Sequence, residues 1–166
     1  MKTKHLTKLA LLTAIALTIF FLELQIPSPV PIPGVKLGLS NIVTLYCVFA
    51  YGPWSALAVL FCRVILGCLF SGRVTAIAYS LAGGLLSWAL MCGLKKLVTE
   101  KQIWVCSVLG GLAHNLGQVL AAMLITGTPS IFVYFPVLAA SGMAAGLFTG
   151  LCAQLLLKRL HEIGQK

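Results

Sequence analysis

Apolar residues fall into six runs, separated by short stretches that contain turn-forming or charged residues. Runs of this kind predict membrane-spanning helices, each of which needs about 20 residues. The second run is short by that measure, so we expect it to begin within the membrane or to pack against the proline-rich stretch before it. The runs cover residues 6–24, 39–50, 54–70, 74–94, 103–125 and 131–157.

The composition agrees with that pattern. Hydrophobic residues make up 60% of the 166 residues and charged residues 9%, with a mean hydropathy of +1.03. A soluble domain carries about a quarter charged residues, so this chain lacks the polar surface that a soluble globule requires. The sequence predicts an all-α integral membrane protein, a six-transmembrane-helix bundle that forms a single domain over residues 1–166.

The first apolar run follows a basic start and could be mistaken for a signal peptide. It is longer than the apolar region of a usual signal peptide, and no small-x-small cleavage site precedes Glu23. We therefore expect this run to be the first membrane helix.

Lysine and arginine placement predicts the orientation. With the N-terminus inside, nine basic residues fall on the cytoplasmic side and two outside, while Arg63 lies within a run. That bias follows the positive-inside rule, so both termini are expected to be cytoplasmic and residues 25–40 extracytoplasmic. The nine are Lys2, Lys4, Lys8, Lys95, Lys96, Lys101, Lys158, Arg159 and Lys166.

The stretch QIPSPVPIPGVKLGLSN, residues 25–41, has a proline at every second position from 27 to 33. Proline lacks an amide donor and restricts the preceding residue, so no helix can run through this stretch. An extended segment here could fold over a pocket between the helices, which makes residues 25–40 a candidate Pro-rich loop or lid. A plain extracytoplasmic linker is the alternative.

A charged side chain within the membrane is costly, which makes Arg63 a candidate functional residue. It lies nine residues after Trp54, or about 14 Å along a helix, near the membrane midplane. Lys36 and Arg73 add positive charge in the outer half, near Asn41, and suit an anion such as a phosphate or carboxylate. The nearby acid, Glu23, offers an alternative: a structural ion pair with Arg63.

The stretch GGLAHNLGQVLAA, residues 110–122, places three polar residues in an apolar run. His114 and Gln118 are one helical turn apart and share a face, and Asn115 is adjacent. Buried polar groups need partners, so these could bind a polar or heteroaromatic ligand, or could cross-link helices. His114 is also a conceivable proton carrier.

Small residues recur at the spacing of closely packed membrane helices. Gly142, Gly146 and Gly150 form a doubled GxxxG, which predicts tight packing within the bundle. Ala10 and Ala14 form an AxxxA near the cytoplasmic end of the first run, and this patch could dock a partner helix.

The sequence has no aspartate and three glutamates, which excludes most carboxylate-based chemistry. Its six cysteines include no CxxC pair, and most lie in apolar runs as small hydrophobic residues. We therefore expect no enzyme activity, catalytic residue, metal site or cofactor. The net charge of +9 reflects topology signals at the ends of the runs, so no nucleic-acid partner is expected.

The predicted six helices, the two cytoplasmic termini, the AxxxA and the loop after the first helix resemble the substrate-binding S components of energy-coupling factor (ECF) transporters. PIPGVKLGLSNIVTL and GGLAHNLGQVLAA more specifically resemble the Gx transporter family, whose members are often labelled heptaprenyl diphosphate synthase component I.

This resemblance implies a substrate in the outer half, under the loop after the first helix. It also implies partners: a membrane scaffold subunit, which Ala10 and Ala14 would face, and two cytosolic ATPases. The chain has no phosphate-binding GxxxxGK[ST] of its own, so its partners would supply ATP hydrolysis. The protein is thus expected in the bacterial cytoplasmic membrane as a multi-pass subunit.

The leading hypothesis is an S component for a vitamin- or cofactor-type, anionic small molecule, such as a flavin or a quinone or isoprenoid precursor. The alternative is a non-transporting membrane anchor subunit of a quinone-linked redox or polyprenyl diphosphate synthase complex. Prenyl transfer itself depends on Asp-rich motifs, which this chain lacks. The candidate ligand-binding residues are Glu23, Lys36, Asn41, Arg63, Arg73, His114, Asn115 and Gln118.

Overall fold

A computed structural model describes residues 3–26 and 37–164, and this part of the chain is helical. It contains six α-helices and two short 3-10 helices, η1 and η2. The bounds are α1 Thr3–Glu23, α2 Asn41–Ala50, α3 Pro53–Phe70, α4 Ala76–Leu94, η1 Glu100–Gln102, α5 Ile103–Thr126, η2 Pro129–Tyr134 and α6 Phe135–Gly164.

Each predicted apolar run corresponds to one α-helix, which confirms the all-α membrane bundle. Five of the helical segments are long and apolar enough to cross a membrane, so the chain is a multi-pass membrane protein. The remaining helix, α2, has 10 residues and is too short to span the membrane by itself. The prediction that the second run is short is therefore correct.

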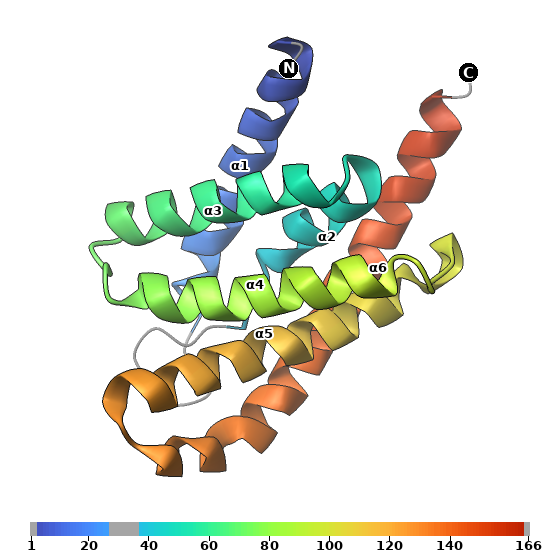
Figure 1. Ribbon diagram of the computed structural model, residues 1–166. Helices are drawn as coiled ribbons and strands as arrows, with labels where there is room; N and C mark the ends of the chain where they lie inside the picture. The colour runs from blue at the N-terminus through green and yellow to red at the C-terminus, as the bar shows by residue number, and fades with distance from the viewer. Residues whose placement is uncertain (1–2, 27–36, 165–166) are drawn as a thin grey trace.

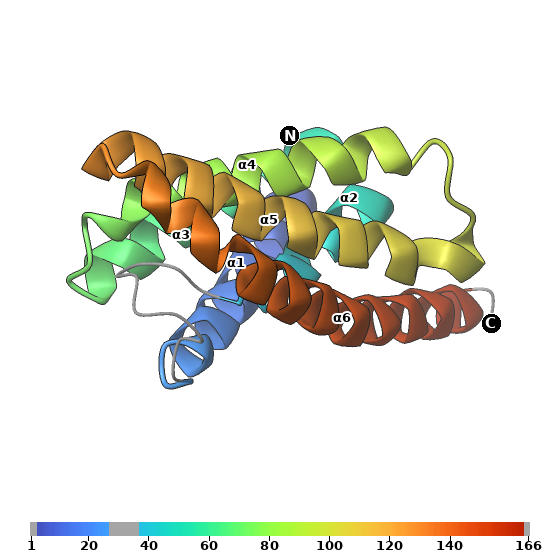
Figure 2. The same cartoon turned by 90° about the horizontal axis from the view of Figure 1, so that it is seen from below.

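The helices α3, α4 and α5 lie side by side and run in alternating directions, while α1 crosses them at a steep angle (Figures 1 and 2). Helix α6 packs along α5. The α3–α4 turn lies at the same end of the bundle as the α5–α6 connection and the C-terminal end of α1. We call this end the α3–α4 end.

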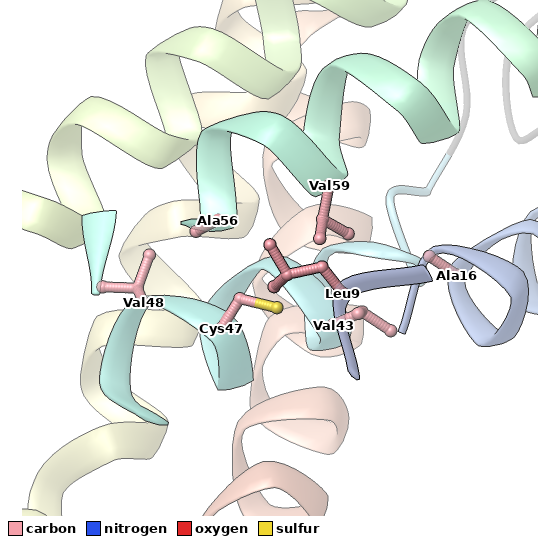
Figure 3. Packing of buried hydrophobic residues seen from close by; sticks show 7 residues of the cluster. All are labelled: Leu9, Ala16, Val43, Cys47, Val48, Ala56 and Val59. Carbon is pink, nitrogen blue, oxygen red and sulfur yellow. The ribbon is translucent and has the colours of Figure 1, made fainter. Parts of the chain in front are cut away.

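The short helix α2 is held by apolar packing between α1 and α3 (Figure 3). Its buried side chains interlock with small and branched side chains of both neighbours, which is the packing that stabilises helix contacts in membranes. The buried residues that meet there are Leu9 and Ala16 of α1, Val43, Cys47 and Val48 of α2, and Ala56 and Val59 of α3.

A lysine from another helix completes the C-terminal end of α2. Lys95, just after α4, donates from Nζ to the carbonyl oxygen of Val48 at 2.7 Å, and its ammonium lies over the ring of Phe49. The last carbonyls of a helix have no partners within the helix and carry partial negative charge. The lysine therefore caps the C-terminal end of α2.

The glycines of α6 permit close contact with α5, as the GxxxG pattern predicts. A Cβ atom on Gly146 would lie 2.7 Å from the carbonyl oxygen of Ser107, and one on Gly150 would lie 2.7 Å from Cα of Trp104. Real Cβ atoms do not approach backbone atoms so closely. Packing explains this stripe of small residues, and no ligand is needed to account for it.

Candidate functional site

Side chains from α1, α3, α4 and α5, together with the segment before α2, meet at a small polar cavity near the α3–α4 end. Its volume of about 10 Å³ matches one water molecule. Four of the predicted site residues line it, namely Glu23, Arg63, His114 and Gln118. The complete lining is Phe20, Glu23, Gly38, Ser40, Arg63, Val64, Ser80, His114 and Gln118.

Arg63 is buried at the cavity and donates hydrogen bonds to two neighbouring side chains. Its side chain is 3% exposed, although its helix carries lipid-facing apolar residues on other faces. Nη1 donates to the hydroxyl of Ser40, and Nη2 donates to Oδ1 of Asn41 at 3.4 Å. The guanidinium of α3 is thereby joined to the N-terminal end of α2.

Glu23, the last residue of α1, is buried on the same cavity at 4% exposure. Its Oε1 accepts a hydrogen bond from the backbone N–H of Gly38. Its charge acts on Arg63, but no ion pair within 4.0 Å joins the two in the part of the chain that the structure describes. The predicted alternative, a direct ion pair between these residues, therefore does not form here.

Gly38 brings the backbone against the cavity in a way that other residues could not. Its φ of +80° lies in the left-handed region, which glycine adopts without a steric penalty. A Cβ atom there would lie 2.8 Å from Nδ2 of Asn41 and 2.9 Å from the ring of His114. The glycine thus places an N–H beside Glu23 and leaves room for the imidazole.

His114 and Gln118 project from α5 into the cavity, as their shared helical face predicts. Both are buried, at 4% and 0% exposure, and each has an interaction partner within the protein. Gly83 of α4 accommodates them, because a Cβ atom there would lie 2.6 Å from the carbonyl oxygen of His114 and 2.8 Å from Cγ of Gln118.

Some buried polar atoms around the cavity have no hydrogen-bond partner. Nε of Arg63 and Oγ of Ser80 belong to lining residues, and Nδ2 of Asn41 adjoins them. An unpartnered buried donor costs about 1–3 kcal/mol, more when it is charged. Such a set of donors is suited to a ligand that carries hydrogen-bond acceptors.

The other predicted site residues lie elsewhere. Asn115 faces α6 and donates from Nδ2 to the carbonyl oxygen of Leu138, so it cross-links two helices. Arg73 is exposed in the α3–α4 turn and does not line the cavity. Lys36, and the lid residues from 27 to 36, lie outside the described part of the chain.

Ala10 and Ala14 are both exposed on α1. Apolar residues flank them on that surface, since Leu6, Leu11 and Ile15 are also exposed. The AxxxA patch therefore lies on the exposed surface of the described bundle.

Sequence reasoning missed five lining residues: Phe20, Gly38, Ser40, Val64 and Ser80. Serine is common at helix contacts in membranes, so Ser80 gave no signal in an apolar run. The glycine in VKLGLSN precedes a helix, where glycine is ordinary. Ser40 directly precedes α2 and could have been suspected as a capping residue, although its hydroxyl accepts from Arg63 instead.

The cavity brings together groups that can donate and groups that can accept hydrogen bonds. It holds one buried cation, one buried carboxylate, hydroxyls, an amide and an imidazole. Among the described residues there is no group of three or more His, Cys, Asp or Glu side chains that could hold a metal ion.

Three comparisons with known proteins bear on this fold. The chain resembles a solved structure of the S component of a bacterial ECF transporter, with a TM-score of 0.64, 19% sequence identity and 100% coverage of both chains. A search of curated proteins finds no match. A family profile, described as heptaprenyl diphosphate synthase component I, matches residues 12–156. The resemblance expected from the sequence is therefore confirmed, and the chain belongs to the heptaprenyl diphosphate synthase component I family.

Proposed function

We propose that this protein is the substrate-binding membrane subunit, the S component, of an ECF-like transporter. The observation that carries the proposal is the small cavity beside the buried Arg63, in a chain with the fold of an ECF S component. A buried arginine with an unpartnered Nε is costly in a membrane protein, and binding a ligand is a function that accounts for that cost.

The positive-inside rule supports a cytoplasmic location for both termini in a bacterial plasma membrane. In that orientation the α3–α4 end is extracytoplasmic, and the cavity lies in the outer half of the bundle. A substrate would enter from outside, at the end of the bundle where α1 ends and α2 begins. The proposed lid consists of residues 25–40.

The substrate class that we propose is a vitamin- or cofactor-type small molecule with acceptor atoms that bind Arg63. The cavity has room for about one water molecule, so a larger ligand requires the surrounding segments to move apart. Binding would replace the hydrogen bonds of Arg63 to Ser40 and Asn41, or would add to them through the unpartnered Nε.

Partners would supply the energy, because the chain has no phosphate-binding GxxxxGK[ST]. We propose a membrane scaffold subunit and two cytosolic ATPases. The exposed Ala10 and Ala14 of α1 would face the scaffold, since small exposed residues allow close approach of another helix.

The family description favours a second candidate, a membrane anchor subunit of a polyprenyl diphosphate synthase or a quinone-linked redox complex. Prenyl transfer of this kind uses aspartates that hold magnesium on the diphosphate, and the sequence contains none. In such a complex the protein would therefore be a non-catalytic subunit.

Affinity purification from native membranes, followed by mass spectrometry of proteins and small molecules, separates the two candidates. Recovery of a scaffold subunit and two ATPases, with a bound small molecule, supports the transporter. Recovery of a prenyl synthase or redox proteins, without ATPases or small molecule, would refute it. A matched purification of an unrelated multi-pass protein identifies contaminants.

A further inference from the structure

The cavity contains buried side chains of both charges, and neither charge neutralises the other directly. Glu23 comes from the end of α1 and Arg63 from α3, and both line the cavity. Each is bound instead to the segment before α2, Glu23 through the N–H of Gly38 and Arg63 through Ser40.

Both charged groups retain hydrogen-bonding capacity. Nε of Arg63 has no partner, and the hydroxyl of Ser80, which lines the same cavity, has none either. Oε1 of Glu23 accepts one hydrogen bond, from the N–H of Gly38. A carboxylate has about four acceptor positions on its two oxygens, so Glu23 can accept further hydrogen bonds. The cavity therefore offers hydrogen-bond donors from α3 and α4, namely Arg63 and Ser80, and a hydrogen-bond acceptor from α1, namely Glu23.

This pattern disfavours a simple anion. A phosphate or diphosphate would gain from Arg63, but it would also meet the carboxylate of Glu23 in a site of low dielectric, where like charges repel strongly. A ligand with an acceptor next to a donor would satisfy both groups, because a guanidinium binds the acceptor and a carboxylate binds an N–H or ammonium. The ring of Phe20 and the side chain of Val64 supply apolar walls for the rest of it.

We infer that the substrate is amphoteric: it presents carbonyl or carboxylate oxygens to Arg63 and Ser80, and an N–H or ammonium group to Glu23. A heterocycle with adjacent C=O and N–H groups and an amino acid-like zwitterion share this chemistry. A prenyl diphosphate has no such donor and is excluded by the inference. The inference rests on the proposed transporter function and narrows its substrate class.

The test is capture of small molecules from a cell metabolite extract by the immobilised, detergent-purified protein. Mass spectrometry identifies what is retained, and calorimetry with the identified compound gives its affinity. The variants are Glu23→Gln, which keeps the size of the side chain and removes its charge, and Arg63→Lys. Glu162→Gln is the matched control, because Glu162 is an exposed glutamate near the end of α6.

The expected result is a retained molecule that carries both an acceptor and an N–H or amine. Its affinity falls about tenfold or more in Glu23→Gln and in Arg63→Lys, because each loses a charge-assisted or bidentate bond. The control binds as the unmodified protein does. Thermal unfolding of each variant shows that the loss of affinity occurs in a folded bundle.

Two other outcomes are informative in different ways. Retention of an anion that lacks a donor, with unchanged or stronger binding in Glu23→Gln, would overturn the inference and leave the transporter proposal intact. Retention of no small molecule by the unmodified protein, relative to beads with an unrelated membrane protein, would overturn the proposed function and the inference with it.

Discussion

Replacing Gly117 by alanine should separate α4 from α5 directly beside the cavity. Gly117 lies on α5 between His114 and Gln118. A Cβ atom there would lie 2.7 Å from the carbonyl oxygen of Ala82 and 2.8 Å from Cα of Gly83. Both are backbone atoms of α4, so no side-chain rotation can relieve the contact, and the helices must move apart.

The magnitude follows from two opposing terms. Overpacking of this kind costs about 1–3 kcal/mol, and contact with backbone places this site toward the upper end. Alanine in a helix is favoured over glycine by about 1 kcal/mol, which offsets part of that cost. The net destabilisation is about 2 kcal/mol, which for a chain of this size lowers the melting temperature by about 4–8 °C.

Thermal unfolding of the purified protein in detergent measures this shift. Gly93→Ala is the matched control, because Gly93 also lies in a helix but a Cβ atom there would have nothing within 4 Å. We expect that variant to be as stable as the unmodified protein or up to about 1 kcal/mol more stable. Equal melting temperatures for the two variants would refute the close α4–α5 contact.

Three further predictions concern the site and its surroundings. Arg63→Ala abolishes ligand binding by calorimetry while circular dichroism shows a folded bundle, and unchanged affinity would remove Arg63 from the site. Asn115→Leu destabilises the bundle by about 1 kcal/mol or more in thermal unfolding, since the bond to the carbonyl of Leu138 is lost; weaker ligand binding at unchanged stability would instead return Asn115 to the site. Ala14→Trp reduces co-purification of the scaffold subunit at least about tenfold, whereas Ala144→Trp on the exposed face of α6 does not; equal losses would show that α1 has no special role.

The sequence predicts the helices well because a membrane makes their signal strong. A run of apolar residues long enough to span has few alternatives to a helix, since every backbone group must bond within its own segment. The same setting makes Arg63, His114 and Gln118 visible as candidates. A charged or strongly polar side chain in such a run needs a specific partner.

The direction of the side chain explains why two residues predicted at the site do not line the cavity. Asn115 follows His114 by one position, which is about 100° around a helix, and it therefore faces α6 and not the cavity. Arg73 has the expected sign of charge and lies at the expected end, but its side chain is exposed. Ser80 was missed because a serine in an apolar helix is tolerated at little cost.

The relation of Glu23 to Arg63 also bears on the choice between a binding subunit and an anchor. In a bundle whose charges served stability alone, two opposite charges buried on one cavity would gain most by pairing directly, because each relieves the desolvation of the other. Here each charge is bound to the segment between α1 and α2, and donor capacity is left over at Nε of Arg63. That segment follows α1, whose small residues Ala10 and Ala14 are exposed. Binding a molecule between the two charges would therefore act on the end of α1 as well as on α2, which connects the cavity to the surface proposed for the scaffold.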